Sequence, residues 1–423
     1  MRPTVSAIVV ALATPGLLSA QARAPLVPSH PAIGYSQQPA RDRVATLGLQ
    51  LQRGEVTLPY DRVLGFLPGL LDALDVPVES QTLVFSKTSL QVEDIGPANP
   101  RAIYFNDDVA VAWIRGAPVI EIAAHDPEQG VMFYALRQHR AFAQRGFQRP
   151  RSCLECHIAD TTLDVPGLAV GSAVIDADGE AYRATVVDHR TPVVERWGGW
   201  YVTGETGSGE HIGNTVATGT PARMRVDPTN LNLASLDGRT DLTGYLSPHS
   251  DIAALMVLEH QTHMTNLLTR VGWDYRVALH DGRSTGLADD GTPADPALAS
   301  VVRDVVDYLL LVDEAELEDT MRGAAGFERR FAARGPFDDQ GRTLRELDLE
   351  RRLFRYPCSY MIYTAVFDAL PAEARDAIYA RMWTVLTGRD DDARYERLSA
   401  DDRTAVIEIL RATKPDLPSY YWD

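Results

Sequence analysis

Two of the three cysteines in this chain of 423 residues stand three positions apart, and a histidine follows the second. They are Cys153, Cys156 and His157, in the stretch "RSCLECHIAD". Thiolates and imidazoles bind metals, and paired thiols form disulfides. The pattern is therefore compatible with an attached haem, another metal ion or a redox disulfide. The third cysteine, Cys358, lies among tyrosines in "RYPCSYMIY", which predicts a small buried apolar residue.

The order C-x-x-C-H meets each requirement of covalent haem attachment. One helical turn brings two thiols with this spacing to the same edge of a porphyrin, where they add to its two vinyl groups. The adjacent histidine then lies beneath the iron as its proximal ligand. A zinc site would usually add a second C-x-x-C or a histidine pair, and a redox disulfide would follow a parallel strand. The sequence therefore predicts one haem c, attached at Cys153 and Cys156 and ligated by His157.

Residues 1–22 have the pattern of a secretory signal peptide. Arg2 provides a positive charge, an apolar run from Val5 to Leu18 follows, and small residues surround the expected cleavage point before Pro25. The apolar run is too short to span a membrane. We expect an exported mature chain in the periplasm, without an integral membrane segment. Covalent haem attachment also takes place outside the cytoplasm, so the two predictions agree.

The C-L-E-C-H sequence and the export signal together resemble a monohaem c-type cytochrome of bacterial periplasmic type. The resemblance implies thioether bonds at Cys153 and Cys156 and a proximal ligand at His157. It does not extend to the fold, because in small soluble cytochromes c the motif opens a helical domain and a methionine ligand follows. Here the motif lies mid-chain, and the nearest comparable methionine is Met224 in "PARMRVDP". The segments "VFSKTSLQ", "RWGGWYVTG" and "EILRATKPDLP" resemble those of a larger bacterial family of haem-motif proteins.

The periodicity of the chain predicts an α+β fold rather than a small all-α cytochrome c. Its parts are a signal peptide (1–22), an exposed lead-in (23–60), a β-rich haem-binding region (61–247) and an α-helical region (248–423). β-branched and aromatic runs from 80 to 137 predict an antiparallel meander before the cysteines, and "DADGEA" predicts a hairpin turn after them. Helices are expected over 250–271, 296–322, 343–367, 371–388 and 398–411, with Ser250 as the first N-cap and Asp295 or Pro296 at the second start.

A glycine-rich stretch, "RWGGWYVTGETGSGEHIGN" (196–214), carries aromatic and basic residues that suit a haem pocket. Glycines let the backbone approach a flat ring closely, so Trp197 and Trp200 would cover the porphyrin face and Arg196 would bind a propionate. His211 would then lie near the iron. The alternative is a surface loop anchored by its aromatic residues.

The first of the expected helices places Met256, His260 and His263 on one stripe. The two histidines suit a distal iron ligand or proton donor. The alternative is that they are core histidines, hydrogen-bonded to their neighbours. For the sixth iron ligand we rank His211 first, His260 with His263 second, and a methionine such as Met224 or Met256 last.

The net charge of −17 restricts the function. A strongly acidic chain repels nucleic acids and anionic membrane surfaces. An electron carrier needs both axial positions of the iron filled, whereas a peroxidase-like or other haem enzyme needs an open distal site. A haem-stabilised structural or sensing subunit of a larger complex is the third hypothesis. We expect a redox protein or a small molecule as partner and prefer electron transfer, while the sequence leaves open whether the chain is catalytic.

Overall fold

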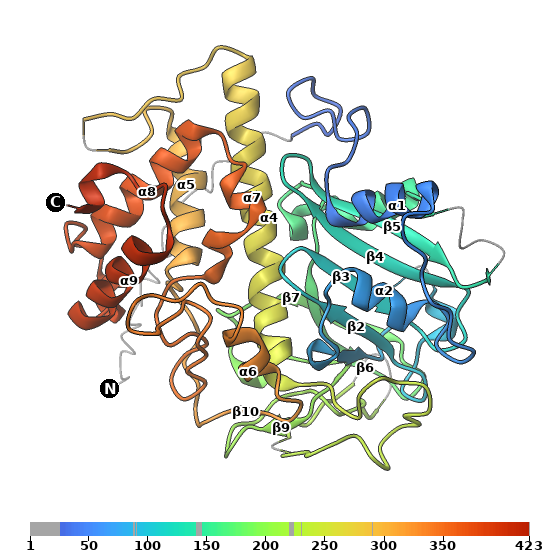
Figure 1. Cartoon of the computed structure of the whole chain (residues 1–423). Coiled ribbons are helices and arrows are strands. Elements are labelled where there is room, and N and C mark those ends of the chain that lie inside the picture. The colour runs from blue at the N-terminus through green and yellow to red at the C-terminus, as the bar shows by residue number, and fades with distance from the viewer. Residues whose placement is uncertain are drawn as a thin grey trace, which may run out of the picture.

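A six-stranded antiparallel sheet and a group of helices lie side by side, with one long helix between them (Figure 1). The computed structural model describes residues 26–87, 89, 91–140, 146–219, 224–229, 231–289 and 291–422. The signal peptide expected over 1–22 lies outside the described residues. Helices account for 35% of the structure and strands for 17%, with the sheet in the N-terminal half and helices in the C-terminal half. The predicted α+β class is confirmed, and the fold is not that of a small all-α protein.

The large sheet is the predicted meander with one further strand at its edge. Its strands are β1 (Thr82–Val84), β2 (Arg101–Phe105), β3 (Val109–Trp113), β4 (Val119–Asp126), β5 (Gly130–Arg137) and β8 (Trp200–Tyr201), in the order β5-β4-β3-β2-β1-β8. Side chains alternate between the two faces, because a strand repeats every two residues. One face carries buried residues such as Tyr104 and Ile122, whereas the other carries half-buried residues such as Ile103 and Ala112.

The buried face of this sheet packs against the N-terminal part of the chain. Helices α1 (Arg43–Arg53) and α2 (Leu67–Ala73) supply Val44 and Leu70 to the core cluster that contains Tyr104. Asp42, the N-cap of α1, accepts a hydrogen bond from the Tyr134 hydroxyl on β5. The described part of 23–60 is thus packed on the sheet. Its polar composition suggested an exposed lead-in, but a few apolar residues are enough to cover one end of the sheet.

Two smaller sheets complete the β structure. The first consists of β6 (Val170–Ile175) and β7 (Ala181–Val187), which form the predicted hairpin after the cysteines. The Asp176 side chain shapes its turn by accepting hydrogen bonds from the backbone N–H groups of Asp178 and Glu180. The second pairs β9 (Gly204–Glu205) with β10 (Arg322–Gly323) and so joins distant parts of the chain.

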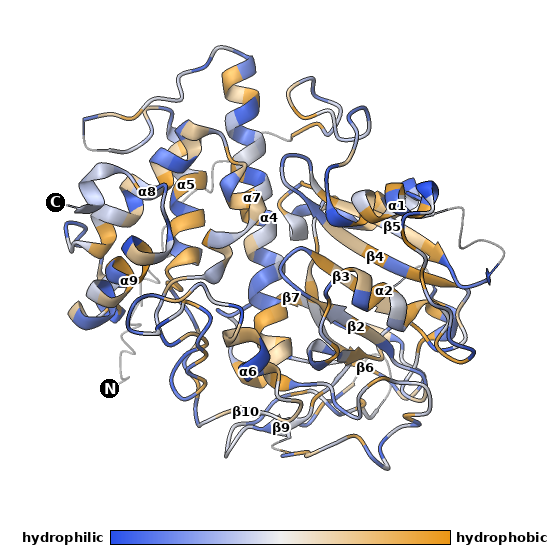
Figure 2. Cartoon of the chain, in the orientation of Figure 1, coloured by the Kyte–Doolittle hydropathy of each residue, from blue (hydrophilic) through white to orange (hydrophobic). Residues whose placement is uncertain are grey.

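Helix α4 (Ile252–His280) runs between the large sheet and the other helices (Figure 1). It is longer than predicted, and most of its residues are buried. Figure 2 shows hydrophilic and hydrophobic residues alternating along it, because polar side chains such as Gln261 and Asn266 hydrogen-bond to the segments around it. Its N-cap is Asp251 rather than the predicted Ser250, whose hydroxyl bonds instead to the edge of the sheet. No helix in the described part of the chain, α4 included, is long and apolar enough to cross a membrane.

The remaining helices follow the sequence prediction only in part. They are α5 (Pro296–Leu309), α6 (Phe327–Ala332), α7 (Ala365–Asp368), α8 (Ala372–Leu386) and α9 (Ala400–Thr413). Both α8 and α9 lie where helices were expected, and Asp295 is the N-cap of α5, which ends earlier than predicted. The long helix expected over 343–367 is wrong, since only α7 and a 3₁₀ turn (Tyr360–Tyr363) are helical there. Asp348 helps to break it by bonding to the backbone of Glu350 and Arg351, which competes with a helix.

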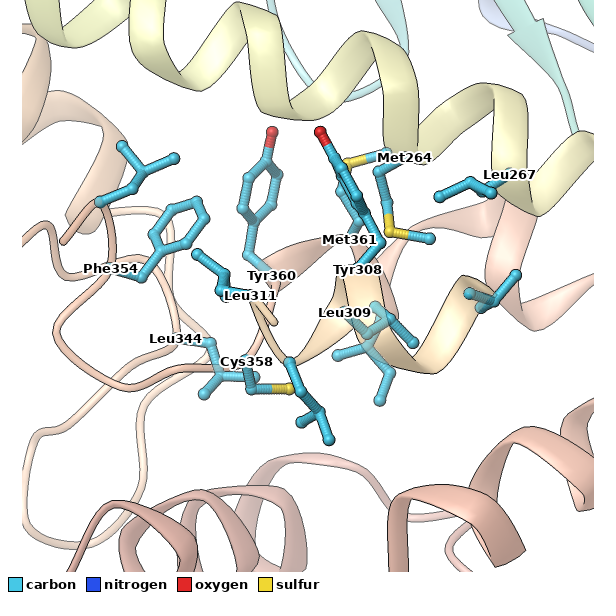
Figure 3. Packing of buried hydrophobic residues seen from close by; sticks show 14 of the residues in the cluster. Met264, Leu267, Tyr308, Leu309, Leu311, Leu344, Phe354, Cys358, Tyr360 and Met361 are labelled. Atoms are coloured by element: carbon cyan, nitrogen blue, oxygen red, sulfur yellow. The ribbon is translucent and has the colours of Figure 1, made fainter. Parts of the chain in front are cut away.

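The segment expected to form that helix lines a core instead (Figure 3). Leu344, Phe354 and Cys358 belong to the cluster of buried residues that also includes residues of α4 and α5. The Cys358 side chain is fully buried, as predicted for a small apolar residue. Tyr360 directs its hydroxyl toward α4, where it donates a hydrogen bond to the Gln261 side chain. The segment thus fixes α4 from the side opposite the sheet.

Candidate functional site

The C-L-E-C-H sequence forms one short helical turn between β5 and β6. A 3₁₀ turn (Arg151–Cys153) leads directly into α3 (Leu154–His157). Cys153 is half-buried against apolar residues of β4 and β5, Cys156 is exposed, and both are free thiols. A helical turn with two free thiols is the arrangement that attachment through two thioethers requires.

The imidazole of His157 is held in one orientation. Its Nδ1 lies 2.9 Å from the carbonyl oxygen of Gly167, and the ring packs on Phe133 with 4.3 Å between ring centroids. Because a carbonyl oxygen only accepts, Nδ1 donates and Nε2 carries the lone pair of the neutral ring. Burial lowers the pKa of His157, which favours the neutral form. Nε2 has no hydrogen-bond partner within the described part of the chain, so its lone pair is available to a metal ion.

Helix α4 fixes the backbone that orients this histidine. The Asn266 side chain accepts a hydrogen bond from the Leu168 N–H at 3.1 Å and donates one to the Leu168 carbonyl at 2.7 Å. The approach is close, since a Cβ atom on Gly167 would lie 2.2 Å from Oδ1 of Asn266. Position 167 therefore requires glycine, and the orientation of His157 depends on α4.

The motif lies beside the half-buried face of the large sheet, which is lined by small apolar residues. We call this surface the alanine-lined face, and its residues on β3, β4 and β5 are Ala110, Ala112, Ala123, Ala135 and Phe133. Cys153, Leu154 and Leu168 pack against one end of it. Alanine side chains leave room for a flat ring, and three of the four alanines keep part of their surface uncovered by the described protein atoms. This face offers an apolar support of the kind that cofactor sites use.

The guanidinium of Arg196 is not free to bind a propionate. Arg196 is 2% exposed, and its Nη1 pairs with the Glu259 carboxylate of α4 at 3.2 Å. Nε donates to the Thr191 carbonyl at 2.7 Å, and Nη2 donates to the His189 carbonyl at 3.0 Å. The expected propionate contact is therefore not supported, because the group is buried and each of its three nitrogens already donates inside the protein.

Trp197 and Trp200, which follow Arg196 closely in the sequence, are buried. They therefore do not form an exposed surface that could cover a porphyrin. The Trp200 indole donates to the Gly171 carbonyl of β6, and both side chains belong to the core cluster around α4. Their place in the structure is accounted for by packing, which argues against both a haem-covering loop and a surface loop.

His211, ranked first as distal ligand, is fully buried beside Trp197. Its Nδ1 accepts a hydrogen bond from the Gly213 N–H at 3.0 Å. An amide N–H only donates, so Nε2 carries the proton of the neutral ring and has no lone pair for iron. Burial lowers the pKa of His211 to about 4, which keeps the ring neutral near pH 7. The structure does not support the first rank given to His211.

The histidine pair on α4 is engaged as well. Nδ1 of His260 lies 2.8 Å from Nδ1 of His189, and its Nε2 lies 2.7 Å from the Ser359 hydroxyl. Nε2 of His263 lies 3.3 Å from a guanidinium nitrogen of Arg190, which only donates. Both arrangements match the alternative interpretation of core histidines hydrogen-bonded to neighbours, and neither leaves a free lone pair for iron.

The two methionines ranked last differ in position. Met256 is 2% exposed in the core cluster around α4. Met224 is half-buried, and its backbone carbonyl accepts a hydrogen bond from Arg183 on β7. The role of Met224 as sixth ligand stays a prediction.

Several residues that shape the site could not be found from local sequence. His189, which packs on the Tyr308 ring, is 1% exposed although turn residues surround it in the sequence. Gly167 stands in a Val-Pro-Gly stretch that signals a turn, but nothing nearby indicates its contact with Asn266. Such contacts join distant parts of the chain and leave no periodic pattern.

The residues at the motif fit a covalently attached haem better than zinc. They provide two free thiols on one turn, a neutral imidazole with an available lone pair, and a flat apolar surface. Zinc would need further ligands, and the one cluster of metal-ligating side chains found among the described residues lies elsewhere, at His30, His280 and Asp281. No protein-family model, curated protein or solved structure matches this chain.

Proposed function

We propose that the chain is a periplasmic c-type haem protein with a role in electron transfer or an associated redox reaction. One haem is attached through Cys153 and Cys156, with His157 as proximal ligand. The observation that carries the proposal is the state of His157. Its Nδ1 is fixed by the Gly167 carbonyl, and its Nε2 lone pair has no other partner among the described residues. An imidazole oriented in this way, next to two free thiols, suits an iron porphyrin.

Each residue of the site has its own task in this proposal. The thiols of Cys153 and Cys156 add across the vinyl groups, His157 presents Nε2, and the alanine-lined face supports the ring. When bound, haem supplies a centre that gains and loses one electron. Cys156 is exposed, so it would hold its edge of the ring near the surface, where a redox partner protein could approach.

A haem enzyme with an open distal site is the second candidate function. It is favoured by the hydrogen bonds of His211, His260 and His263, which leave none of these rings with a lone pair for iron. Without a sixth protein ligand, the iron is open to a small-molecule substrate. Met224 as ligand would instead close the site and favour the electron carrier.

Covalent attachment is tested by expression in a host with active haem-attachment machinery. The denatured, acid–acetone-extracted protein should retain its haem, and Cys153→Ser with Cys156→Ser should lose it. Cys358→Ala removes a buried thiol elsewhere and should leave the haem attached. Colourless wild-type protein would contradict the proposal. N-terminal sequencing should find a mature start between Gln21 and Pro25, whereas retained Met1 would contradict export.

The two functions are separated by absorption spectra of the ferric and ferrous protein with and without carbon monoxide. A low-spin spectrum that the gas does not change identifies an electron carrier with both axial positions filled. A high-spin spectrum, or one that changes with the gas, identifies an open distal site. The same measurement on Met224→Ala shows whether this methionine is the ligand that closes the site.

A further inference from the structure

Arg101, the first residue of β2, carries a largely buried charge, and one of its hydrogen-bond donors is not satisfied. Its side chain is 14% exposed, and its nearest carboxylate oxygen, on Glu121, lies 3.7 Å from Nη1, beyond hydrogen-bond distance. Its Nε is buried without a partner among the described residues. A guanidinium has five N–H donors, and burying it without hydrogen bonds is costly. Burial accordingly lowers the pKa of Arg101, only partly offset by the Glu121 carboxylate.

Glu121 does not supply the missing partner. Its carboxylate oxygens accept hydrogen bonds from the Ser89 hydroxyl at 3.0 and 3.1 Å. Its side chain is also 29% exposed, so water reaches it. The Arg101–Glu121 pair is therefore a loose one, and the guanidinium keeps donors for a second acidic group.

Arg101 lies on the alanine-lined face. Side chains alternate along β2, so Arg101 shares a face with Ile103, which pairs with Ala112 on β3. Its guanidinium also extends toward the motif, because Glu121, 3.7 Å from Nη1, lies on β4, one of the strands against which Cys153 packs. The chain thus places a positive charge on the surface that supports the ring in the proposed function.

The guanidinium of Arg101 lies closer to the motif than its strand does. The side chain starts on β2 and extends across β3, because its Nη1 lies 3.7 Å from the carboxylate of Glu121 on β4. The cysteines pack at β4 and β5. In a haem the vinyl groups and the two propionates lie at opposite edges. A ring held by the cysteines and extended over this face would bring its propionates toward the strands that the Arg101 side chain covers.

We propose that Arg101 binds a propionate of the attached haem on the alanine-lined face. This inference rests on the proposed function. A planar guanidinium donates two parallel hydrogen bonds to a carboxylate, which would satisfy the groups left open on Arg101. The carboxylate of the haem, rather than Glu121, is the partner that completes the site.

Arg101→Gln tests the contact through the haem rather than through activity. The resonance Raman bending band of the propionates should shift in the variant. The haem midpoint potential should fall, because an unneutralised propionate stabilises ferric iron. The amount of covalent haem should stay unchanged. Arg303→Gln removes an equal charge at an exposed position of α5 and should leave both the band and the potential as in the wild type.

A second variant keeps the test decisive if Arg101→Gln folds poorly. Arg101→Lys retains the charge and loses the paired hydrogen bonds, so the Raman band should shift while the potential stays near that of the wild type. An unchanged band in both variants, with haem still attached, would overturn the role of Arg101 and leave the proposed function standing. Wild-type protein that attaches no haem would overturn the proposed function itself.

Discussion

Hydrogen-bonding neighbours determine what each histidine of this protein can do. Nδ1 of His157 faces a carbonyl, which only accepts, so Nε2 is left with its lone pair. Nδ1 of His211 faces an N–H group, which only donates, so Nε2 is protonated. Both residues are histidines, and the sequence alone does not distinguish them. One backbone atom beside each ring decides whether Nε2 keeps a lone pair that could bind iron.

Substitution of the buried histidines should therefore affect stability rather than the haem. We expect His211→Ala and His260→Ala each to lower the free energy of unfolding by about 1–3 kcal/mol, because hydrogen-bonded partners are left buried and unpaired. Their absorption spectra should match that of the wild type, whereas His157→Ala should change the spectrum. Urea unfolding and absorption spectra of the three variants test this. A changed spin state in His211→Ala would restore it as the distal ligand.

His125 gives the fold a dependence on pH. Burial lowers its pKa to about 4, whereas the unfolded chain protonates this side chain near pH 6.5. Between these values only the unfolded chain takes up the proton, so the contribution is fully present above about pH 6.5 and is lost as the pH falls toward 4.

Relative to His125→Gln, the wild type should lose up to about 3 kcal/mol of stability over this pH range. Urea unfolding of both proteins at pH 7 and pH 4.5 measures the difference directly. His139→Gln, at an exposed position, is the matched control and should run parallel to the wild type. A constant difference between His125→Gln and the wild type would show that His125 does not cause the effect.

At the scale of helices and strands, the sequence predicted the features that depend on local signals and missed those that depend on distant contacts. The meander and the β6–β7 hairpin were predictable, because alternation and turn residues are local signals. The start of α4 was ambiguous, since Ser250 and Asp251 are both good N-caps. The choice between them is made by β1 and β8, because Leu83 donates to the Ser250 hydroxyl and Tyr201 accepts from it.

We expect Asp251, the N-cap of α4, to stabilise the protein more than Asp295, the N-cap of α5. The buried carboxylate of Asp251 accepts hydrogen bonds from the N–H groups of Ala253, Ala254 and Ala325. Asp251→Ala should therefore lower the free energy of unfolding by about 2 kcal/mol or more. Asp295→Ala, which removes a more exposed cap from α5, should cost about 1 kcal/mol. Equal losses in thermal unfolding would mean that the contact to Ala325 contributes nothing.

The candidate site was predictable only where its chemistry is contiguous in sequence. Cys153, Cys156 and His157 could be proposed as a site because covalent haem attachment requires residues close together in sequence. The alanine-lined face, Gly167 and Asn266 come from different elements and are assembled only by the fold. Arg196 suggested a haem contact by its neighbours in sequence, but its neighbours in space engage each of its three guanidinium nitrogens.

At the scale of the whole molecule, α4 joins the two halves that the sequence separated at residue 247. One core cluster contains Val84 and Phe105 from the sheet together with Leu298 and Tyr379 from the C-terminal helices. α4 lies between them and is buried along most of its length. Neither half therefore has a complete core of its own.

Unfolding of the whole chain should accordingly be a single cooperative event. Circular dichroism and tryptophan fluorescence should give coincident urea transitions. A chain truncated after residue 247 should lack stable tertiary structure, because it exposes the apolar surface that α4 covers. Two separate transitions, or a truncated chain that unfolds cooperatively, would show that the halves are independent domains.

In the proposed function, the hydrogen bonds between Asn266 and Leu168 imply an order of maturation. A chain exported as proposed would present Cys153 and Cys156 while it is still unfolded, before Asn266 has docked. Thioether formation needs only the short turn of the motif and is possible at that moment. The final orientation of His157 needs Gly167 to be held against α4, which exists only after the downstream half has folded. Attachment would thus come first and iron ligation last, and newly made protein should carry its haem before acquiring its mature spectrum.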